Sequence, residues 1–235
     1  GGETDVKLAT SVRSVRTQDF SAIPGFKSHF RIFALATAWE IESGSSPEVE
    51  AIAEHIHFYL SLFRELSSCG YWFGDVTVSL SDIRITDALI ERYSLDRERL
   101  GRETQIPNPT YLAEAGVTIP AHVSSIDELT TKEMRASGAG HFLTALGSTG
   151  IEVFDKCRPS SPETNFCFDL ARLAGIGYYS DLCFKITATN RHDQTFPLID
   201  GGTTPWTASL LHSNRERIMT SGIGTELVCQ HFKDN

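Results

Sequence analysis

One long amphipathic segment does most to limit the folds open to this chain of 235 residues. It begins at Pro47, where Ser46 is the predicted N-cap, and Glu48 and Glu50 occupy the first turn, where the helix dipole favours acidic groups. Apolar residues then recur at three- and four-residue spacing: Val49, Ile52, Ala53, Ile56, Tyr59, Leu60, Phe63 and Leu66. The pattern predicts an amphipathic helix of about five turns that ends near Cys69.

Strand patterns lie on both sides of this helix. The run from residue 29 to 39 is short and almost continuously apolar, which indicates a buried strand. It is expected to pair with a strand at 6–18 through a hairpin loop at 18–28. Further strands are predicted at 76–80, 178–189, 196–200 and 217–221, and further helices at 81–93 and 225–232. An antiparallel sheet with helices set to one side makes the predicted fold class α+β.

The stretch from 95 to 150 differs in composition from the rest of the chain. It is rich in Arg, Glu, Thr and Gly, contains three prolines and has no long apolar run. We interpret it as a mostly helical insertion. The chain then divides into a first part of the core (1–94), the insertion (95–150) and a second part of the core (151–235).

Charge and cysteine content exclude several classes of protein. The chain has 21 Lys and Arg against 30 Asp and Glu, a formal net charge of −9, which argues against a duplex-binding protein. No run approaches the roughly 18 apolar residues of a membrane helix. The five cysteines have no CxxC spacing, so we expect reduced thiols in a cytoplasmic protein and no metal site. His55 and His57 are two positions apart on a helix and cannot share a metal.

Three glycine-containing segments follow one another in the last third of the chain. They are Ala174–Tyr179 (AGIGYY), Leu198–Thr203 (LIDGGT) and Ser221–Leu227 (SGIGTEL). Glycine lets a backbone approach a ligand closely because no Cβ intervenes. Candidate ligand contacts in these segments are Tyr178, Tyr179, Gly201, Gly202, Gly222 and Gly224. Tyr178 and Tyr179 are expected to alternate across a strand, so that only one faces the ligand and the other packs.

The order and spacing of these segments resemble the histidyl-tRNA synthetase branch of the class II aminoacyl-tRNA synthetases. In that family an RGLDYY strand, a GGRYD turn and the motif 3 glycine–arginine element occur in the same order. Upstream, Arg16 resembles the motif 2 arginine and residues 29–40 its returning strand. The resemblance implies a class II synthetase-like core that is truncated or reduced, because such a domain usually needs more chain.

The sequence departs from that family where the family binds ATP phosphates. The arginine that opens RGLDYY falls on Ala174, with Arg172 two residues early, and the motif 3 arginine falls on Leu227. The family's motif 2 has the pattern Arg-x-Glu, and this chain has Gln18 at the position of the Glu that follows Arg16. Arginines stabilise charge at the attacked phosphate, so the loss of two would leave little adenylation activity.

The resemblance therefore implies a non-catalytic paralogue, close in character to the regulatory subunit of ATP phosphoribosyltransferase. Such a protein would bind an amino acid such as histidine, or a nucleotide, or regulate a partner enzyme in histidine biosynthesis, as a homodimer. If histidine is the ligand, Glu40 is the acidic contact that the resemblance implies, beside Arg16 and the glycines and tyrosines above. No cofactor is required, and nucleic acid is not the expected partner.

Two alternatives stay open at the level of sequence. The first is an active ATP-dependent amino-acid ligase of class II type, which would use ATP and Mg²⁺. Its substitute phosphate contacts would come from Arg16, Arg31, Arg172, Arg215 or Arg217, of which Arg16 and Arg172 are the candidate catalytic residues. The second is a fold that survives only as an interaction module, with its pocket filled or empty.

Overall fold

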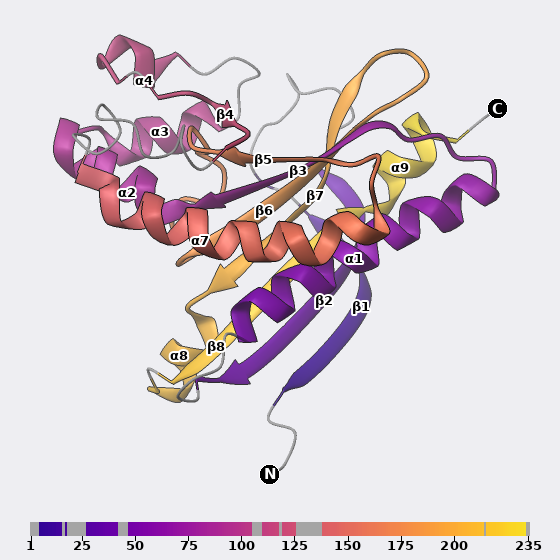
Figure 1. The fold of residues 1–235 in the computed structure, drawn as a ribbon, viewed down its shortest axis with the longest axis horizontal. Coiled ribbons are helices and arrows are strands. Elements are labelled where there is room, and N and C mark those ends of the chain that lie inside the picture. The colour runs from indigo at the N-terminus through magenta and orange to yellow at the C-terminus, as the bar shows by residue number, and fades with distance from the viewer. Residues whose placement is uncertain are drawn as a thin grey trace.

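The core of the protein is a single eight-stranded sheet (Figure 1). The computed structural model describes residues 5–15, 17, 27–41, 47–104, 110–117, 119–125, 138–213 and 215–233. The strands are β1 (Val6–Val15), β2 (His29–Glu40), β3 (Gly74–Asp82), β4 (His122–Val123), β5 (Asn165–Asp169), β6 (Leu182–Thr189), β7 (Thr195–Thr204) and β8 (Glu216–Gly224). Their order across the sheet is β1-β2-β8-β7-β6-β3-β5-β4.

Neighbouring strands are antiparallel except β3 and β5, which run parallel. The N-terminal hairpin β1–β2 pairs with β8 from the other end of the chain, with Ala34 opposite Gly222 and Ile32 opposite Gly224. The sheet therefore brings the first strands and the three glycine-containing segments of the last third into one place. This arrangement confirms the predicted antiparallel sheet flanked by helices, with one parallel pair as the exception.

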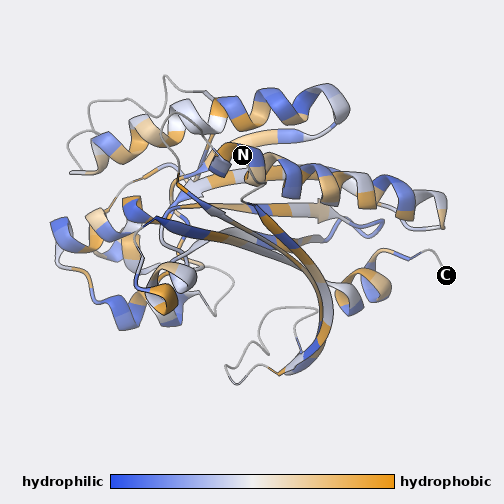
Figure 2. Cartoon of the chain, turned by 90° about the horizontal axis from the view of Figure 1, so that it is seen from below, coloured by the Kyte–Doolittle hydropathy of each residue, from blue (hydrophilic) through white to orange (hydrophobic). Residues whose placement is uncertain are grey.

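Two long helices cover one face of the sheet, as Figure 2 shows with the sheet seen nearly edge-on. The helices are α1 (Pro47–Ser68), α2 (Ile83–Tyr93), α3 (Arg97–Glu103), α4 (Tyr111–Glu114), α7 (Gly140–Cys157), α8 (Trp206–Leu211) and α9 (Thr225–His231), with a 3-10 turn at Arg158–Ser160. Helix α1 runs for 22 residues and its predicted apolar face is buried, since Ile52, Ile56 and Tyr59 are inaccessible to solvent. It packs against α7 and the underside of β8.

Several predicted boundaries change in the structure. Ser46, Arg16 and most of the predicted 18–28 loop lie outside the described residues. Tyr178 and Tyr179 precede β6 in a turn, so the expectation that they alternate across a strand is wrong. The interpretation of Gly201-Gly202 as the end of a strand is also wrong, because β7 continues through both glycines to Thr204. Pairing with β6 and β8 on both sides extends β7 there despite the glycines.

The insertion shares elements with the core. Its described part contains α3, α4 and β4, and β4 adds a strand to the sheet by pairing with β5. The predicted boundary at residue 150 falls inside α7, which packs on both α1 and β3. The three-part division of the chain therefore stays a proposal.

All five cysteines lie in the described part of the chain. Cys157, Cys167 and Cys183 are buried, Cys69 and Cys229 are exposed, and all five are free thiols. In the described ranges, no cluster of His, Cys, Asp and Glu side chains has a metal-binding arrangement. None of the described helices combines the length and apolar character that a membrane span requires.

Candidate functional site

A pocket of about 630 Å³ opens on the face of the sheet away from α1. The side chain of Ser221 bonds to α1, so its strand neighbours Thr220 and Gly222 face the opposite side, where the pocket lies. The described residues that line it are Lys27, Phe30, Ile32, Ala34, Thr104, Ala174, Gly175, Tyr178, Tyr179, Lys185, Pro197, Leu198, Ile199, Asp200, Thr220, Ser221, Gly222, Gly224, Glu226, Leu227 and Gln230.

The floor of the pocket is made by β2 and β8. Ile32 and Ala34 of β2 stand opposite Gly224 and Gly222 of β8. Each apolar side chain of β2 therefore has a glycine as its neighbour on β8. A Cβ atom on Gly222 would lie 2.9 Å from Cγ2 of Ile32. Glycine at this position therefore keeps the floor flat and the space above it open.

A buried ionic network forms the pocket wall on β7. The Arg172 Nη2 atom donates to both carboxylate oxygens of Asp200, at 2.7 and 2.9 Å, and the Tyr179 hydroxyl donates to the same carboxylate at 2.6 Å. The Arg172 side chain is 2 % exposed, whereas Asp200 is 44 % exposed and lines the pocket. Arg172 and Tyr179 thus hold the Asp200 carboxylate in place, and the exposed part of Asp200 faces the pocket.

The protonation states in this network follow from burial and from Asp200. Burial by itself lowers the pKa of Arg172, but the adjacent Asp200 carboxylate outweighs it and raises that pKa. Burial and the same carboxylate both raise the pKa of Tyr179. Arg172 therefore stays a cation and the Tyr179 hydroxyl stays protonated, and both donate hydrogen bonds to the Asp200 side chain.

Gly201 and Gly202 serve packing behind this wall. A Cβ on Gly202 would lie 2.6 Å from Cβ of Cys183 and 2.8 Å from the Tyr179 ring, and one on Gly201 would collide with the Phe184 ring. Neither glycine lines the pocket. Gly202 therefore leaves room for the Tyr179 ring, whose hydroxyl reaches Asp200, and Gly201 leaves room for the Phe184 ring.

Tyr178 stands at the rim of the pocket. Its ring makes edge contacts with Trp206 of α8, at 5.0 Å between centroids, and with Tyr179, at 4.9 Å. Tyr178 is 41 % exposed and Trp206 is 45 % exposed. An aromatic rim of this kind offers a stacking surface to a planar ligand.

A second polar network lies under the floor, on the side of α1. His55 is buried, and its two ring nitrogens lie 3.0 Å from Thr37 Oγ1 and 2.8 Å from Ser221 Oγ. The Tyr59 hydroxyl lies 2.9 Å from the same Ser221 oxygen. Burial lowers the pKa of His55 to about 4, so the ring is neutral and joins α1 to β2 and β8.

The structure gathers part of the predicted site. Tyr178, Tyr179, Gly222 and Gly224 line the pocket. Arg172 is one layer behind it, bound to Asp200. Arg16 lies outside the described residues.

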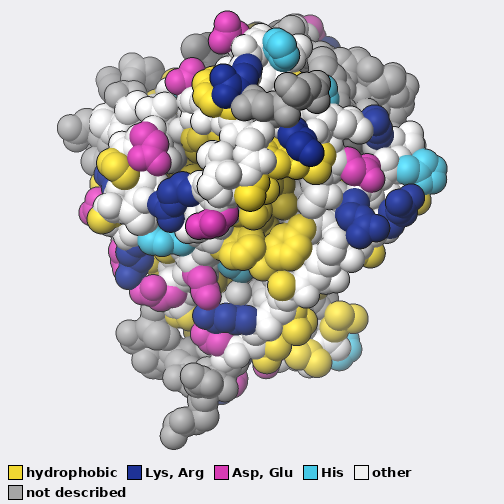
Figure 3. Space-filling view, turned by 90° about the vertical axis from the view of Figure 1, so that its right-hand side faces the viewer, with side chains coloured by type: hydrophobic (Ala, Val, Ile, Leu, Met, Phe, Trp, Pro, Cys, Tyr) yellow, Lys and Arg dark blue, Asp and Glu magenta, His cyan; other side chains and the backbone are white. Residues whose placement is uncertain are grey.

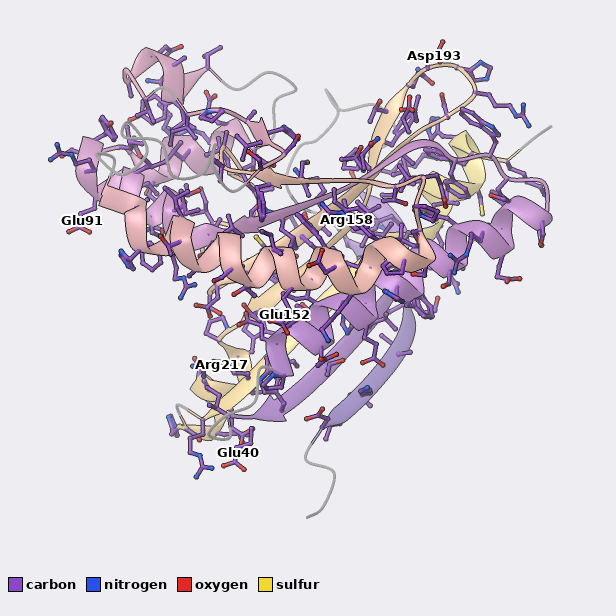
Figure 4. The ribbon with its side chains drawn as sticks, viewed as in Figure 1. Glu40, Glu91, Glu152, Arg158, Asp193 and Arg217 are labelled. Carbon is purple, nitrogen blue, oxygen red and sulfur yellow. The ribbon has the colours of Figure 1, made fainter. Side chains whose placement is uncertain are left out.

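Glu40 lies at the other end of β2, in the corner that also holds Arg217 (Figure 4). It is six positions beyond Ala34, which corresponds to about 20 Å along a strand. Its carboxylate pairs with Arg215 at 3.1 Å, and Arg217 donates to the Glu216 carbonyl at 3.0 Å. Neither arginine is among the lining residues, so the proposed use of Arg215 or Arg217 as a phosphate contact has no support in this geometry.

The two positions at which the family resemblance implies arginines, Ala174 and Leu227, lie at the pocket. Ala174 and Leu227 both line it, and no arginine does among the described residues. The cations that line it are Lys27 and Lys185, and Lys185 lies 3.8 Å from Asp169. Neither Asp200 nor Lys185 was among the site residues predicted from the sequence. Their alternation with buried neighbours in β7 and β6 was the available signal, because it marks them as facing one side of the sheet.

No protein-family model matches this chain, and no curated protein sequence matches it significantly. Solved structures do match. An ATP phosphoribosyltransferase regulatory subunit/histidyl-tRNA synthetase from Bacillus halodurans aligns with 100% of this chain and 60% of its own, at TM-score 0.63 and 13% identity. Histidyl-tRNA synthetase from Nostoc aligns with 86% of this chain and 50% of its own, at TM-score 0.61 and 14% identity.

An ATP phosphoribosyl transferase (HisG:HisZ) complex from Thermotoga maritima aligns with 95% of this chain and 74% of the matched chain, at TM-score 0.52 and 12% identity. At these identities the similarity shows the fold alone, and that fold is the class II synthetase-like one that the sequence resemblance implied. The chain spans 60% and 50% of the length of the first two matched structures.

Proposed function

We propose that this chain is a non-catalytic relative of histidyl-tRNA synthetase that binds a small ligand and regulates a partner enzyme. The observation that supports it most is the composition of the pocket. The glycine floor and tyrosine rim of a synthetase-like site are present, while Ala174 and Leu227 stand where the family resemblance requires phosphate-binding arginines. Arg172, the nearest substitute, is committed to Asp200.

The chemistry of the pocket favours an amino acid such as histidine. Asp200 offers an anion to an ammonium or imidazole group, and Lys27 and Lys185 offer cations to a carboxylate. Apolar residues such as Ile32 and Leu198 surround a side chain, and Tyr178 can stack on a planar one. A nucleotide is the second ligand class, because stacking on Tyr178 would suit a base equally well.

The partner in this proposal is a catalytic subunit of ATP phosphoribosyltransferase, in the cytoplasm. One structural neighbour was solved as part of such a complex. Ligand binding would act on the partner by favouring one of two conformations, which requires that the ligand bind the two with different affinity. A homodimeric state and a role in histidine biosynthesis belong to the same proposal.

Calorimetric titration with histidine, with other amino acids and with ATP tests the ligand. Two tyrosines of equal exposure provide a matched pair of variants, Tyr178 at 41 % on the rim and Tyr93 at 42 % at the end of α2. Tyr178→Ala should weaken binding on the order of tenfold, because a stacked aromatic contact is lost, and Tyr93→Ala should leave it unchanged. Absence of heat with every ligand, or equal effects of both variants, would contradict the proposal.

The partner is tested separately by adding this chain to an isolated ATP phosphoribosyltransferase catalytic subunit. The expected result is a change in its rate that saturates with the amount of this chain and that responds to histidine. A rate that stays constant at all concentrations of this chain would remove the regulatory part of the proposal and leave the ligand-binding part standing. ATP and Mg²⁺ belong only to the alternative of an active ligase.

A further inference from the structure

Lys185 is the more enclosed of the two lysines that line the pocket in the described part of the chain. It lies on β6 directly opposite Asp200 of β7, and both residues line the pocket. Its side chain is 25 % exposed, whereas Lys27 is an exposed residue before β2. Water screens an exposed charge more strongly than an enclosed one. Lys185 therefore exerts the stronger attraction on an anionic group of a ligand.

The Lys185 ammonium group is held at the end of the pocket away from Asp200. Its Nζ atom lies 3.8 Å from a carboxylate oxygen of Asp169 on β5. Strand β3 lies between β6 and β5, so the Lys185 side chain crosses β3 to reach Asp169. Asp200 is on β7, the opposite neighbour of β6. Because strands are about 4.8 Å apart, the ammonium group and the Asp200 carboxylate are separated by roughly 10 Å.

The contact with Asp169 positions Lys185 without using its hydrogen-bond donors. A distance of 3.8 Å exceeds that of a hydrogen bond. Among the described residues, no other side chain accepts a hydrogen bond from the Lys185 ammonium group. Asp169 is nearly buried, with 9 % of its side chain exposed, so it is a fixed counterion. The N–H donors of Lys185 therefore remain available to a ligand.

The charges around the pocket favour a ligand with one carboxylate over a polyphosphate. The charged residues of the described lining and of the layer behind it are balanced, with the cations Lys27, Lys185 and Arg172 and the carboxylates Asp169, Asp200 and Glu226. On the face of the molecule that Figure 3 shows, basic side chains are likewise scattered among acidic ones, with hydrophobic side chains gathered between them. A triphosphate brings several negative charges and would meet no net positive charge here.

The separation of Lys185 from Asp200 also limits the length of the ligand. A hydrogen bond of about 2.8 Å at each end leaves about 4–5 Å between the ligand's carboxylate and its N–H donor. In histidine, four bonds of about 1.5 Å join the carboxylate carbon to the nearer ring nitrogen, which spans about 5 Å. An amino acid with a nitrogen-bearing side chain of this length can therefore reach both residues.

We propose that Lys185 is the specificity-determining residue of the pocket, which binds the single carboxylate of the ligand while Asp200 accepts a hydrogen bond from a nitrogen at its other end. The ligand class is a free amino acid, selected against amines that lack the carboxylate and against polyphosphates. Asp169 acts through Lys185 and is a positioning residue. This inference rests on the proposed ligand-binding function and adds to it the residue that selects the ligand.

Calorimetric titration with histidine and with histamine, which is histidine without its carboxylate, tests the role of Lys185. The wild-type chain should bind histidine on the order of tenfold more tightly than histamine. Lys185→Met should lose this preference because it weakens the binding of histidine alone, whereas Lys185→Arg keeps the charge and should keep the preference. Lys156→Met is the matched control and should change neither affinity. Lys156 is also ion-paired, with Glu50 at 2.7 Å, but it lies on α7, which covers the other face of the sheet (Figure 2).

A double variant keeps the test independent of folding. Lys185→Met leaves the nearly buried Asp169 carboxylate without its counterion, whereas Lys185→Met/Asp169→Asn leaves no unpaired charge and should show the same loss of preference.

Several results would overturn the role of Lys185 and leave the proposed ligand-binding function standing. They are equal binding of histidine and histamine by the wild-type chain, a preference that survives in the double variant, a preference that is lost in Lys27→Met instead, and tighter binding of ATP than of histidine. Absence of heat with histidine, histamine and ATP alike would remove the proposed ligand-binding function and this inference together.

Discussion

Adjacent residues of β8 face two different environments. Ser221 points toward α1 and is held by His55 and Tyr59 in a network closed on all sides. Its neighbour Gly222 points the other way and lines an open pocket. On the first side both ring nitrogens of His55 and the hydroxyls of Tyr59 and Ser221 have protein partners, whereas on the second side Arg172 holds Asp200, which stays 44 % exposed.

The two faces of β8 therefore differ in role: one face stabilises the sheet, and the other forms the pocket. The network under the floor stabilises β2 and β8 against α1, and its hydrogen-bonding side chains lie on the α1 side of the sheet. The network in the wall uses the same kind of buried hydrogen bonds, but directs one carboxylate outward. Substitutions under the floor should therefore affect stability alone, whereas substitutions in the wall or floor of the pocket should also affect ligand binding.

The largest effect is expected from Asp200→Asn. The substitution leaves the Arg172 guanidinium buried at 2 % exposure without its counterion, and loss of one partner of a buried pair costs about 3–5 kcal/mol. Chemical denaturation of the variant measures this loss. Asp200→Asn/Arg172→Met is the control and should recover part of the stability, because no unpaired charge remains. Equal stability of wild type and Asp200→Asn would show that the wall network does not hold the pocket.

A pH effect of about 3 kcal/mol is expected from the other side of the sheet. The pKa of His55 falls from 6.5 to about 4 on folding, so the folded state binds fewer protons than the unfolded state between these values. Stability from this group is complete above pH 6.5 and is lost as the pH falls toward 4. His55→Gln should flatten the dependence of the unfolding free energy on pH in that window. An unchanged slope would contradict a neutral, buried His55.

The smallest expected effects come from the neighbouring pair itself. Ser221→Ala leaves the His55 ring and the Tyr59 hydroxyl without a partner, at a cost of about 1–3 kcal/mol, and should not change ligand affinity. Gly222→Ala should cost about 1–3 kcal/mol, because the added Cβ would lie 2.9 Å from Cγ2 of Ile32, a methyl on a stiff β-branched side chain, and it should also weaken ligand binding. Thermal unfolding and calorimetric titration of both variants measure the contrast. If both lose stability and keep affinity, the two faces do not differ in role.

Much of the fold was predictable because buried faces of helices and strands repeat apolar residues at a regular spacing in the sequence. The apolar positions of α1 and the run of β2 gave their types and approximate bounds, and the order of the glycine-containing segments indicated the synthetase-like fold. Local patterns failed at Gly201-Gly202, where glycines usually end a strand. Strand pairing on both sides overrides that preference, and the rings of Phe184 and Tyr179 fill the space that side chains at Gly201 and Gly202 would occupy.

The site was predictable only in part. Gly222, Gly224, Tyr178 and Tyr179 line the pocket, and the order of the glycine-containing segments had made them candidates. Glu40 lies at the wrong end of a long strand to reach those residues, since its place along β2 follows from the strand's length and register and not from its chemistry. The role of Asp200 as the anchored carboxylate depends on Arg172, 28 positions earlier, and a contact between such distant residues leaves no local pattern.

Histidine-dependent exchange between ATP and pyrophosphate tests the central claim most directly, with an active histidyl-tRNA synthetase as the positive control. Ala174 and Leu227 line the pocket at the two positions where the family resemblance predicts phosphate-binding arginines, and Arg172 is bound to Asp200. We expect the chain to bind histidine and to show no exchange above the background without enzyme. Exchange that depends on histidine and disappears in Asp200→Asn/Arg172→Met would contradict it and establish an active adenylate-forming enzyme.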